Sequence, residues 1–94
     1  MKLKKVVTIF GAGSWGTAIA KNISTNGYKV RLWSKEKEVV ESIINYKENR
    51  IFLPGIKLSS SIIPTNLLSD ELFDSDFLIF SIPTQFIRQS LLSM

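Results

Sequence analysis

The chain has 94 residues, of which 45% are hydrophobic and 21% charged, a composition typical of one small globular domain. It contains no cysteine and no histidine, which excludes a disulfide framework, a zinc–thiolate site and the commonest general base. Its 12 basic and 8 acidic residues give a net charge of +4, which suits an anionic small ligand.

The distribution of charge and hydropathy does not indicate nucleic-acid or membrane binding. Lysine and arginine are scattered along the chain rather than clustered. No apolar run reaches the length of a membrane span. The start, MKLKKVVTIFGAGSW, has charge followed by apolar residues, but VVTIF leads directly into glycines and is typical of a strand rather than a targeting segment. We therefore expect a cytoplasmic protein with no nucleic-acid or membrane partner.

The first half of the chain predicts alternating strands and helices. Residues 5–10 are apolar almost throughout and rich in β-branched side chains, as in a strand buried on both faces. A second strand is predicted at 28–33, and helices are predicted at 14–26 and 35–47. Short connections between such elements are typical of a parallel sheet covered by helices. The apolar stripes of the two helices are Trp15, Ala18, Ile19 and Ile23, and Val39, Val40, Ile43 and Ile44.

The second half continues the alternation after a loop at 48–59. A short third strand is predicted at 60–64, and a fully apolar strand at 77–82. Between them we expect a short helix at 66–73, with Asn66 as its cap. A last helix is expected at 85–92, opened by Pro83 or Thr84.

These elements predict an α/β fold, a partial Rossmann-type, doubly wound parallel sheet. They account for the first β-α-β-α-β half and the start of the next helix. A dinucleotide-binding sheet of this type has about six strands in two halves. We therefore expect residues 1–94 to form a single, incomplete domain.

Three glycines follow the first strand in the sequence FGAGSWGTA, at Gly11, Gly13 and Gly16. Gly11 permits a tight turn, Gly13 lets the backbone approach a diphosphate, and Gly16 lets the helix pack close to the strand. The helix N-terminus would offer N–H groups and a partial positive charge to the phosphates. A G-x-G-x-x-G motif between a strand and a helix predicts dinucleotide binding; the alternative is a turn needed only for packing.

The residues inside the turn have two readings each. Ser14 is expected to donate a hydrogen bond to phosphate, or else only to cap the helix. Trp15 is expected either to contact the cofactor or to lie in the core.

The end of the second strand bears on the choice between NAD and NADP. An acidic residue there would bind the ribose 2′-hydroxyl. This chain has Ser34 and Lys35 instead, with Glu36 only further on. A hydroxyl and an ammonium suit a 2′-phosphate, so we expect NADP (NADPH), with NAD as the alternative cofactor. The alternative is that Lys35 is a solvated lysine in the first turn of the helix.

The segment FSIPTQFIR, residues 80–88, follows the last strand. If that strand neighbours the first one, Ser81, Pro83, Thr84 and Phe86 face the cofactor across the switch point of the sheet. The alternative is a strand end and helix start, with Phe86 used for packing.

The motifs GAGSWGTAIA, VRLW, NRIFLPGIKL and FSIPTQFIR occur in this order. Together they resemble the N-terminal part of NAD(P)-dependent glycerol-3-phosphate dehydrogenase, over nearly the whole chain. The resemblance implies reduction of dihydroxyacetone phosphate to sn-glycerol 3-phosphate in the cytoplasm, for phospholipid synthesis. It also implies cofactor contacts at Ser14, Trp15, Lys35 and Phe86, and at Phe52 in the FLPG loop. For Phe52 the alternative is a buried side chain in a turn built on Pro54–Gly55.

The resemblance places the essential lysines and the helical substrate domain beyond residue 94. We therefore assign no catalytic residue and no metal ligand, and expect this chain alone to be inactive. The alternative is a stand-alone, catalytically silent module that binds NADP(H). Because a partial sheet leaves apolar strands uncovered, we expect Val6, Ile9, Leu78 and Phe80 to need partners, through self-association or a homo-oligomer.

Overall fold

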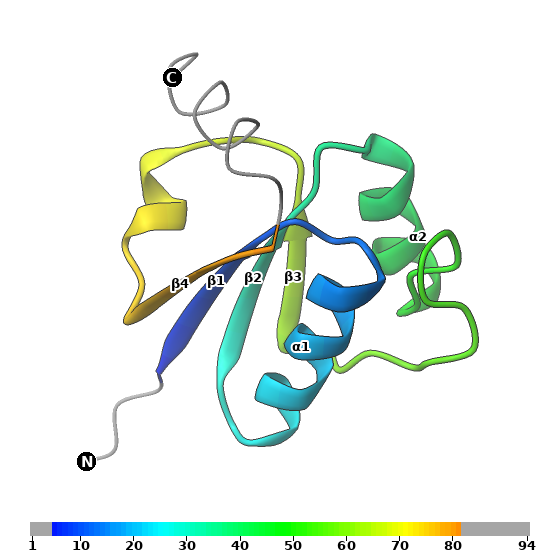
Figure 1. Ribbon diagram of the computed structural model, residues 1–94, viewed down its shortest axis with the longest axis horizontal. Helices are drawn as coiled ribbons and strands as arrows, with labels where there is room; N and C mark the ends of the chain where they lie inside the picture. The colour runs from blue at the N-terminus through cyan, green and yellow to red at the C-terminus, as the bar shows by residue number, and fades with distance from the viewer. Residues whose placement is uncertain (1–4, 82–94) are drawn as a thin grey trace.

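In the part of the chain that the structure describes, four short parallel strands form one central sheet (Figure 1). The computed structural model describes residues 5–81. Within them the sheet order is β3-β2-β1-β4, so the chain builds from β1 first to one side and then to the other. This reversal puts the switch point between β1 and β4. The strands are β1 (Val6–Phe10), β2 (Lys29–Trp33), β3 (Ile62–Thr65) and β4 (Phe77–Phe80).

The strands that meet at the switch point end level with one another. Phe10, the last residue of β1, lies opposite Trp33 of β2 and Phe80 of β4. One residue further, the N–H of Ser81 donates to the Phe10 carbonyl oxygen at 2.9 Å. The prediction that the first and last strands are neighbours is confirmed, and Ile82 lies outside the described residues.

Helices cover the two faces of the sheet unequally (Figure 1). Two α-helices, α1 (Ser14–Thr25) and α2 (Lys37–Tyr46), pack on one face, and a short 3₁₀ helix, η1 (Asp70–Phe73), packs on the other. Successive side chains of a strand point to opposite faces. Val7 and Ile9 of β1 therefore belong to the aliphatic core under the α-helices, whereas Phe10 belongs to an aromatic cluster under η1.

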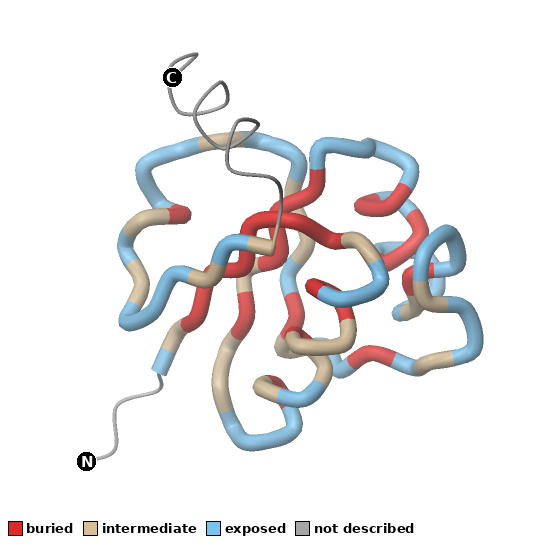
Figure 2. The backbone as a smooth tube through the Cα atoms, in the orientation of Figure 1, coloured by how far each residue is buried: buried red, intermediate tan, exposed pale blue. Residues whose placement is uncertain are grey.

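Burial is concentrated in the two central strands, β1 and β2 (Figure 2). On the η1 face the Phe10 ring stacks on Phe80, with centroids 4.8 Å apart, and also contacts Trp33 and Phe73. The residues that form the aliphatic core are Val7, Ile9, Ala12, Ala20, Val30, Leu32, Val39, Ile43, Leu58 and Ile62.

The buried side of α1 is lined by small residues, not by the predicted apolar stripe. Gly16, Thr17, Ala20 and Ser24 are the buried residues of this helix. Small side chains let the helix axis approach the sheet closely. Ile19 and Ile23 pack only at the edge of the core. Trp15 is 73% exposed, so the reading that placed it in the core is wrong.

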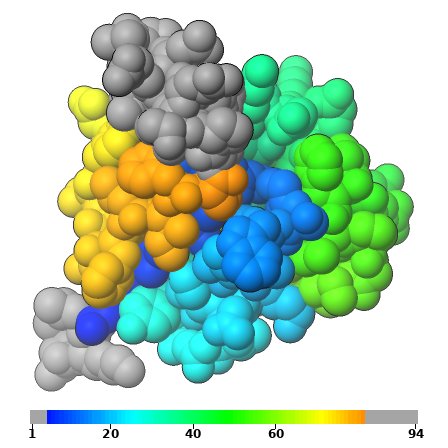
Figure 3. Space-filling model, in the orientation of Figure 1, coloured from blue at the N-terminus to red at the C-terminus, as the bar shows by residue number. Residues whose placement is uncertain are grey.

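The last strand, β4, lies open on the surface. Phe77, Leu78 and Phe80 are 53%, 40% and 43% exposed. In the view of Figure 3 the side chains of β4 lie at the surface beside those of α1. The expectation of uncovered apolar side chains therefore holds for Leu78 and Phe80, but is wrong for Ile9, which is fully buried because α1 covers it.

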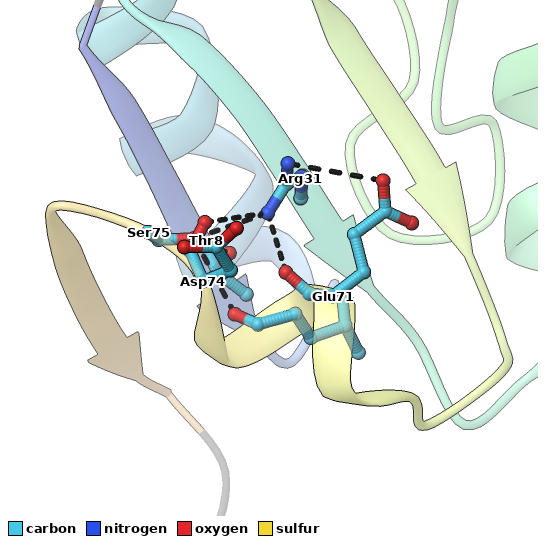
Figure 4. Close-up of polar contacts among 6 residues, drawn as sticks. Thr8, Arg31, Glu71, Asp74 and Ser75 are labelled. Atoms are coloured by element: carbon cyan, nitrogen blue, oxygen red, sulfur yellow. Dashed lines mark hydrogen bonds and ion pairs between the residues drawn. The ribbon is translucent and has the colours of Figure 1, made fainter.

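A single arginine joins η1 to the sheet (Figure 4). Nη1 of Arg31, on β2, donates to the backbone carbonyls of Glu71 and Asp74, the latter at 2.9 Å. Its Nη2 lies 3.8 Å from the Glu71 carboxylate. Beside it, the hydroxyls of Thr8 and Ser75 are hydrogen-bonded. The segment before β4 is thus held by side chains of β1 and β2.

The predicted elements differ from the structure mainly in the second half. The helix expected at 66–73 is reduced to η1, and Ser69, not Asn66, precedes its first residue. In this region, Arg31 bonds to the backbone carbonyls of Glu71 and Asp74, at and just after η1. In α2, Ile44 is 57% exposed although its predicted stripe is otherwise buried. The helix expected at 85–92 lies outside the described residues.

Candidate functional site

The chain leaves β1 and enters α1 through a turn in which Gly11 and Gly16 are each required for a different physical reason. Gly11 has a φ of 117°, which favours glycine, and its N–H donates to the Trp33 carbonyl oxygen at 2.9 Å. At Gly16 an added Cβ would stand 1.9 Å from the backbone oxygen of Gly11 and 2.6 Å from Ser81 Oγ. The packing role predicted for Gly16 is therefore confirmed.

Gly13 is different, because the described fold does not require a glycine there. Its φ of −72° is open to any residue, and an added Cβ would meet no described atom within 4 Å. As far as residues 5–81 are concerned, the space in front of Gly13 is open. A turn needed only for packing explains Gly11 and Gly16, but it gives no reason for Gly13.

The N-terminus of α1 at this turn carries no side-chain cap. Gly13 is the N-cap residue and makes no capping hydrogen bond, and the first turn contains no acidic residue. The first N–H groups of a helix have no partner within the helix, and they carry its partial positive charge. Ser14 is the first helical residue and is exposed, so its reading as a cap is wrong. The exposed Trp15 follows it.

The carbonyl groups of the turn are all engaged inside the protein. Ser81 Oγ donates to the Gly11 oxygen at 2.9 Å, and the N–H of Thr17 donates to the Gly13 oxygen at 3.0 Å. The oxygen of Ala12 accepts from Asn49 Nδ2 at 2.9 Å and from Thr17 Oγ1 at 3.2 Å. With its acceptors occupied, the turn is arranged to present donors, which is the polarity that an anion requires.

Asn49 and Thr17 are site residues that the sequence reasoning missed. Both are fully buried, and Asn49 reaches the turn from the loop at 48–59. The sequence offered one signal for Asn49, which is its position three residues before the FLPG motif.

Phe52 lies in the same loop and is linked to the turn through Asn49. Its side chain is 40% exposed, so the reading as a buried residue is wrong. Its N–H donates to Asn49 Oδ1 at 3.1 Å. The turn expected at Pro54–Gly55 is present, with Gly55 at a φ of 85°.

At the end of β2 the polar residues form a compact turn into α2. Ser34 is 1% exposed, and its N–H donates to the Thr65 oxygen at 2.9 Å. Its Oγ accepts from the N–H of Glu36 at 3.1 Å and lies 3.3 Å from the Glu36 carboxylate. A contact between Ser34 and a cofactor would require this hydroxyl to exchange Glu36 for the ligand. Lys35 is exposed beside it.

Two predicted contacts, Pro83 and Phe86, lie outside the described residues, as does Thr84. Within residues 5–81, no group of three or more acidic, histidine or cysteine side chains is arranged to hold a metal ion. Over the same part of the chain, no helix has the length and hydropathy to cross a membrane. The described part of the site supplies hydrogen-bond donors from the glycine turn and from the N-terminus of α1.

Comparison with known proteins gives a consistent result. Residues 6–94 match the family model described as NAD-dependent glycerol-3-phosphate dehydrogenase N-terminus. A glycerol-3-phosphate dehydrogenase [NAD(P)+] from Bacillus velezensis is 45% identical over 87 residues, which are 93% of this chain and 25% of the relative. The corresponding protein of Bacillus subtilis is 40% identical, with the same coverage. The chain thus spans about a quarter of the length of the curated relatives it matches.

Solved structures agree with the sequence comparison. The glycerol-3-phosphate dehydrogenase of Saccharomyces cerevisiae aligns with a TM-score of 0.80 and 34% identity, over 93% of this chain and 28% of that one. The enzyme of Coxiella burnetii aligns with a TM-score of 0.74 and 32% identity, over 82% of this chain and 24% of that one. The partial Rossmann-type sheet predicted from the sequence is therefore confirmed.

Proposed function

Since this chain belongs to the family of NAD-dependent glycerol-3-phosphate dehydrogenase N-termini, we propose that it is the cofactor-binding part of such an enzyme. The enzyme interconverts dihydroxyacetone phosphate and sn-glycerol 3-phosphate. When bound, the nicotinamide cofactor would supply the hydride for reduction of the ketone and accept it in the reverse direction. The residues of this chain bind and orient the cofactor, and those that act on the phosphorylated substrate belong to the remaining three quarters of such enzymes.

The observation that carries the proposal is the open space in front of Gly13. A Cβ at this position would meet no described atom within 4 Å, yet it would stand at an uncapped helix N-terminus. A diphosphate in that space would accept hydrogen bonds from the turn and from the first turn of α1. Ser14 and Trp15 follow Gly13 in the chain and are exposed, and we propose that they contact the same ligand.

The adenine end of the cofactor would lie at the end of β2, because the carboxyl ends of β1 and β2 meet at one edge of the sheet. Lys35 is exposed there, and we propose that it favours the 2′-phosphate of NADPH over the 2′-hydroxyl of NADH. Ser34 shapes the turn beneath it. Phe52, Pro83 and Phe86 are proposed to complete the cofactor contacts.

Titration of the chain with NADPH and NADH tests the proposal. We expect tighter binding of NADPH, and we expect Lys35→Glu to reduce NADPH affinity at least about tenfold, since a carboxylate would repel the 2′-phosphate. Lys37→Glu is the matched control, because it makes the same charge change at the first residue of α2. An unchanged preference in Lys35→Glu, or an equal loss in Lys37→Glu, would remove the 2′-phosphate assignment. If neither NADPH nor NADH binds to the chain, the proposed function is wrong.

The remaining parts of the proposal concern the whole protein. It would act in the cytoplasm, in glycerophospholipid synthesis, and this chain alone would not turn over substrate. We also propose that the chain associates with itself through its uncovered apolar surface.

A further inference from the structure

The side chain of Asn49 connects two segments that the proposed cofactor would touch. It is fully buried, although it lies 37 residues from Ala12 along the chain. Its Nδ2 donates to the Ala12 oxygen at 2.9 Å and to Thr17 Oγ1 at 2.8 Å. Its Oδ1 accepts from the N–H of Phe52 at 3.1 Å. A buried amide fully engaged between the glycine turn and the FLPG loop fixes each relative to the other.

The bond to Ala12 also controls which way the turn presents its donors. The carbonyl of Ala12 and the N–H of Gly13 belong to one planar peptide unit, and in the trans form they point in opposite directions. When Asn49 and Thr17 hold the carbonyl in the interior, the N–H of Gly13 points the other way. Without these donors the peptide unit is free to rotate and bring a carbonyl oxygen toward the anion.

We propose that Asn49 is a positioning residue for the cofactor diphosphate. It acts through the Ala12–Gly13 peptide unit and not by contact with the ligand, and the inference rests on the proposed function. Since Ser81 engages the Gly11 oxygen from the side of β4, the orientation of the turn is set by side chains from two distant segments. Of these, Asn49 also sets the position of Phe52.

The same loop provides a matched control. Ser42, on α2, is also buried, and its Oγ donates to the Glu48 oxygen at 2.6 Å and accepts from the N–H of Arg50 at 3.0 Å. Ser42→Ala therefore removes two hydrogen bonds to the loop without touching the glycine turn. This variant therefore measures how loosening of the loop alone changes nucleotide affinity.

The experiment compares ligands with and without a diphosphate on the full chain. The ligands are ADP and NADPH, which carry the diphosphate, and adenosine 2′-monophosphate, which does not. We expect Asn49→Ala to weaken ADP and NADPH binding at least about tenfold, because the buried Ala12 carbonyl loses its amide donor, and to leave adenosine 2′-monophosphate affinity within about twofold. Ser42→Ala should leave all three affinities unchanged. In the ligand-free protein, the amide resonance of Gly13 should shift in Asn49→Ala and not in Ser42→Ala.

Wild-type ADP affinity in Asn49→Ala would overturn the inference, as would an equal loss of both ligands or an equal effect of Ser42→Ala. If Asn49→Ala does not fold, Thr17→Val is used, which keeps the side-chain shape and removes the hydroxyl between Asn49 and Ala12. It should show a smaller loss confined to diphosphate ligands, and unchanged affinities would again overturn the inference. If the wild-type chain binds none of these nucleotides, the proposed function falls, and this inference with it.

Discussion

At the scale of single residues, Gly13 and Gly16 separate ligand binding from folding within one turn. We expect Gly16→Ala to destabilise the fold by about 1–3 kcal/mol or more, because the new Cβ would stand 1.9 Å from a backbone oxygen that cannot move aside. We expect Gly13→Ala to keep the melting temperature, since its φ of −72° suits alanine and no described atom lies within 4 Å of the new methyl. Thermal unfolding and NADPH titration measure the two effects.

The two substitutions control for each other, because both add one methyl group to the same turn. Gly13→Ala should lower NADPH affinity at least about tenfold, as the methyl takes the place of a phosphate oxygen near the helix N-terminus. Binding that survives Gly13→Ala unchanged would show that the ligand does not approach this peptide. A wild-type melting temperature for Gly16→Ala would contradict the packing geometry of the turn.

The glycine turn of the candidate site could be predicted because its residues are close together in the sequence. The residues that reach the turn through long-range contacts could not. Gly11, Gly13 and Gly16 act within one strand–turn–helix unit, so their pattern is visible in nine consecutive letters. Asn49 acts 37 residues away from Ala12, and its neighbours in ENRIFLPG do not indicate that contact. Trp15 was ambiguous because hydrophobicity alone cannot distinguish an exposed tryptophan at a turn from a buried one.

At the scale of elements, η1 depends on the guanidinium of Arg31 more than on its own helix propensity. We expect Arg31→Met to lower the free energy of unfolding by about 1.5–3 kcal/mol, since two backbone carbonyls lose a charged donor whose side chain is only 15% exposed. Chemical denaturation measures the loss. Hydrogen exchange should increase first in the segment at 70–76.

Glu71→Gln isolates the contribution of the ion pair from that of the carbonyl contacts. The Glu71 side chain is 75% exposed and lies 3.8 Å from the guanidinium, so its pairing should contribute little. We expect a change within about 0.5 kcal/mol for this variant. A loss in Glu71→Gln as large as that in Arg31→Met would mean that charge pairing, and not the carbonyl bonds, holds η1 in place.

The elements that the sequence predicted well are those whose pattern is local. β1, β2, α1 and α2 follow from apolar periodicity and from turn residues, and their ends agree with the predictions to within two residues. The prediction of a helix over 66–73 was wrong because the contacts of this segment come from β2, about 40 residues earlier in the chain. The prediction of which residues of α1 are buried was wrong for a related reason. Close approach to the sheet selects Gly16 and Ala20, which carry little hydrophobic signal.

At the scale of the whole molecule, the two edges of the sheet differ in how open they are to another chain. The edge strand β3 contains Pro64, which cannot donate to a further strand. The opposite edge strand, β4, has the sequence FLIF, without a proline or a charge, and its outer side pairs with no strand among residues 5–81. Such an edge favours association. Beside this edge, Phe77 and Ile79 line an apolar groove together with Ile23 and Tyr28.

We therefore expect the chain to self-associate through β4, with a sedimentation coefficient that rises with concentration. Phe77→Lys should suppress the rise, because the side chain is 53% exposed and a lysine at an open edge opposes pairing with another strand. Ile63→Lys is the matched control: Ile63 is 44% exposed on β3, where Pro64 already blunts the edge. If Ile63→Lys suppresses association and Phe77→Lys does not, the contact lies at the other edge. A single monomeric species for the unmodified chain at all concentrations would mean that an exposed apolar strand of four residues is too short to recruit a second copy.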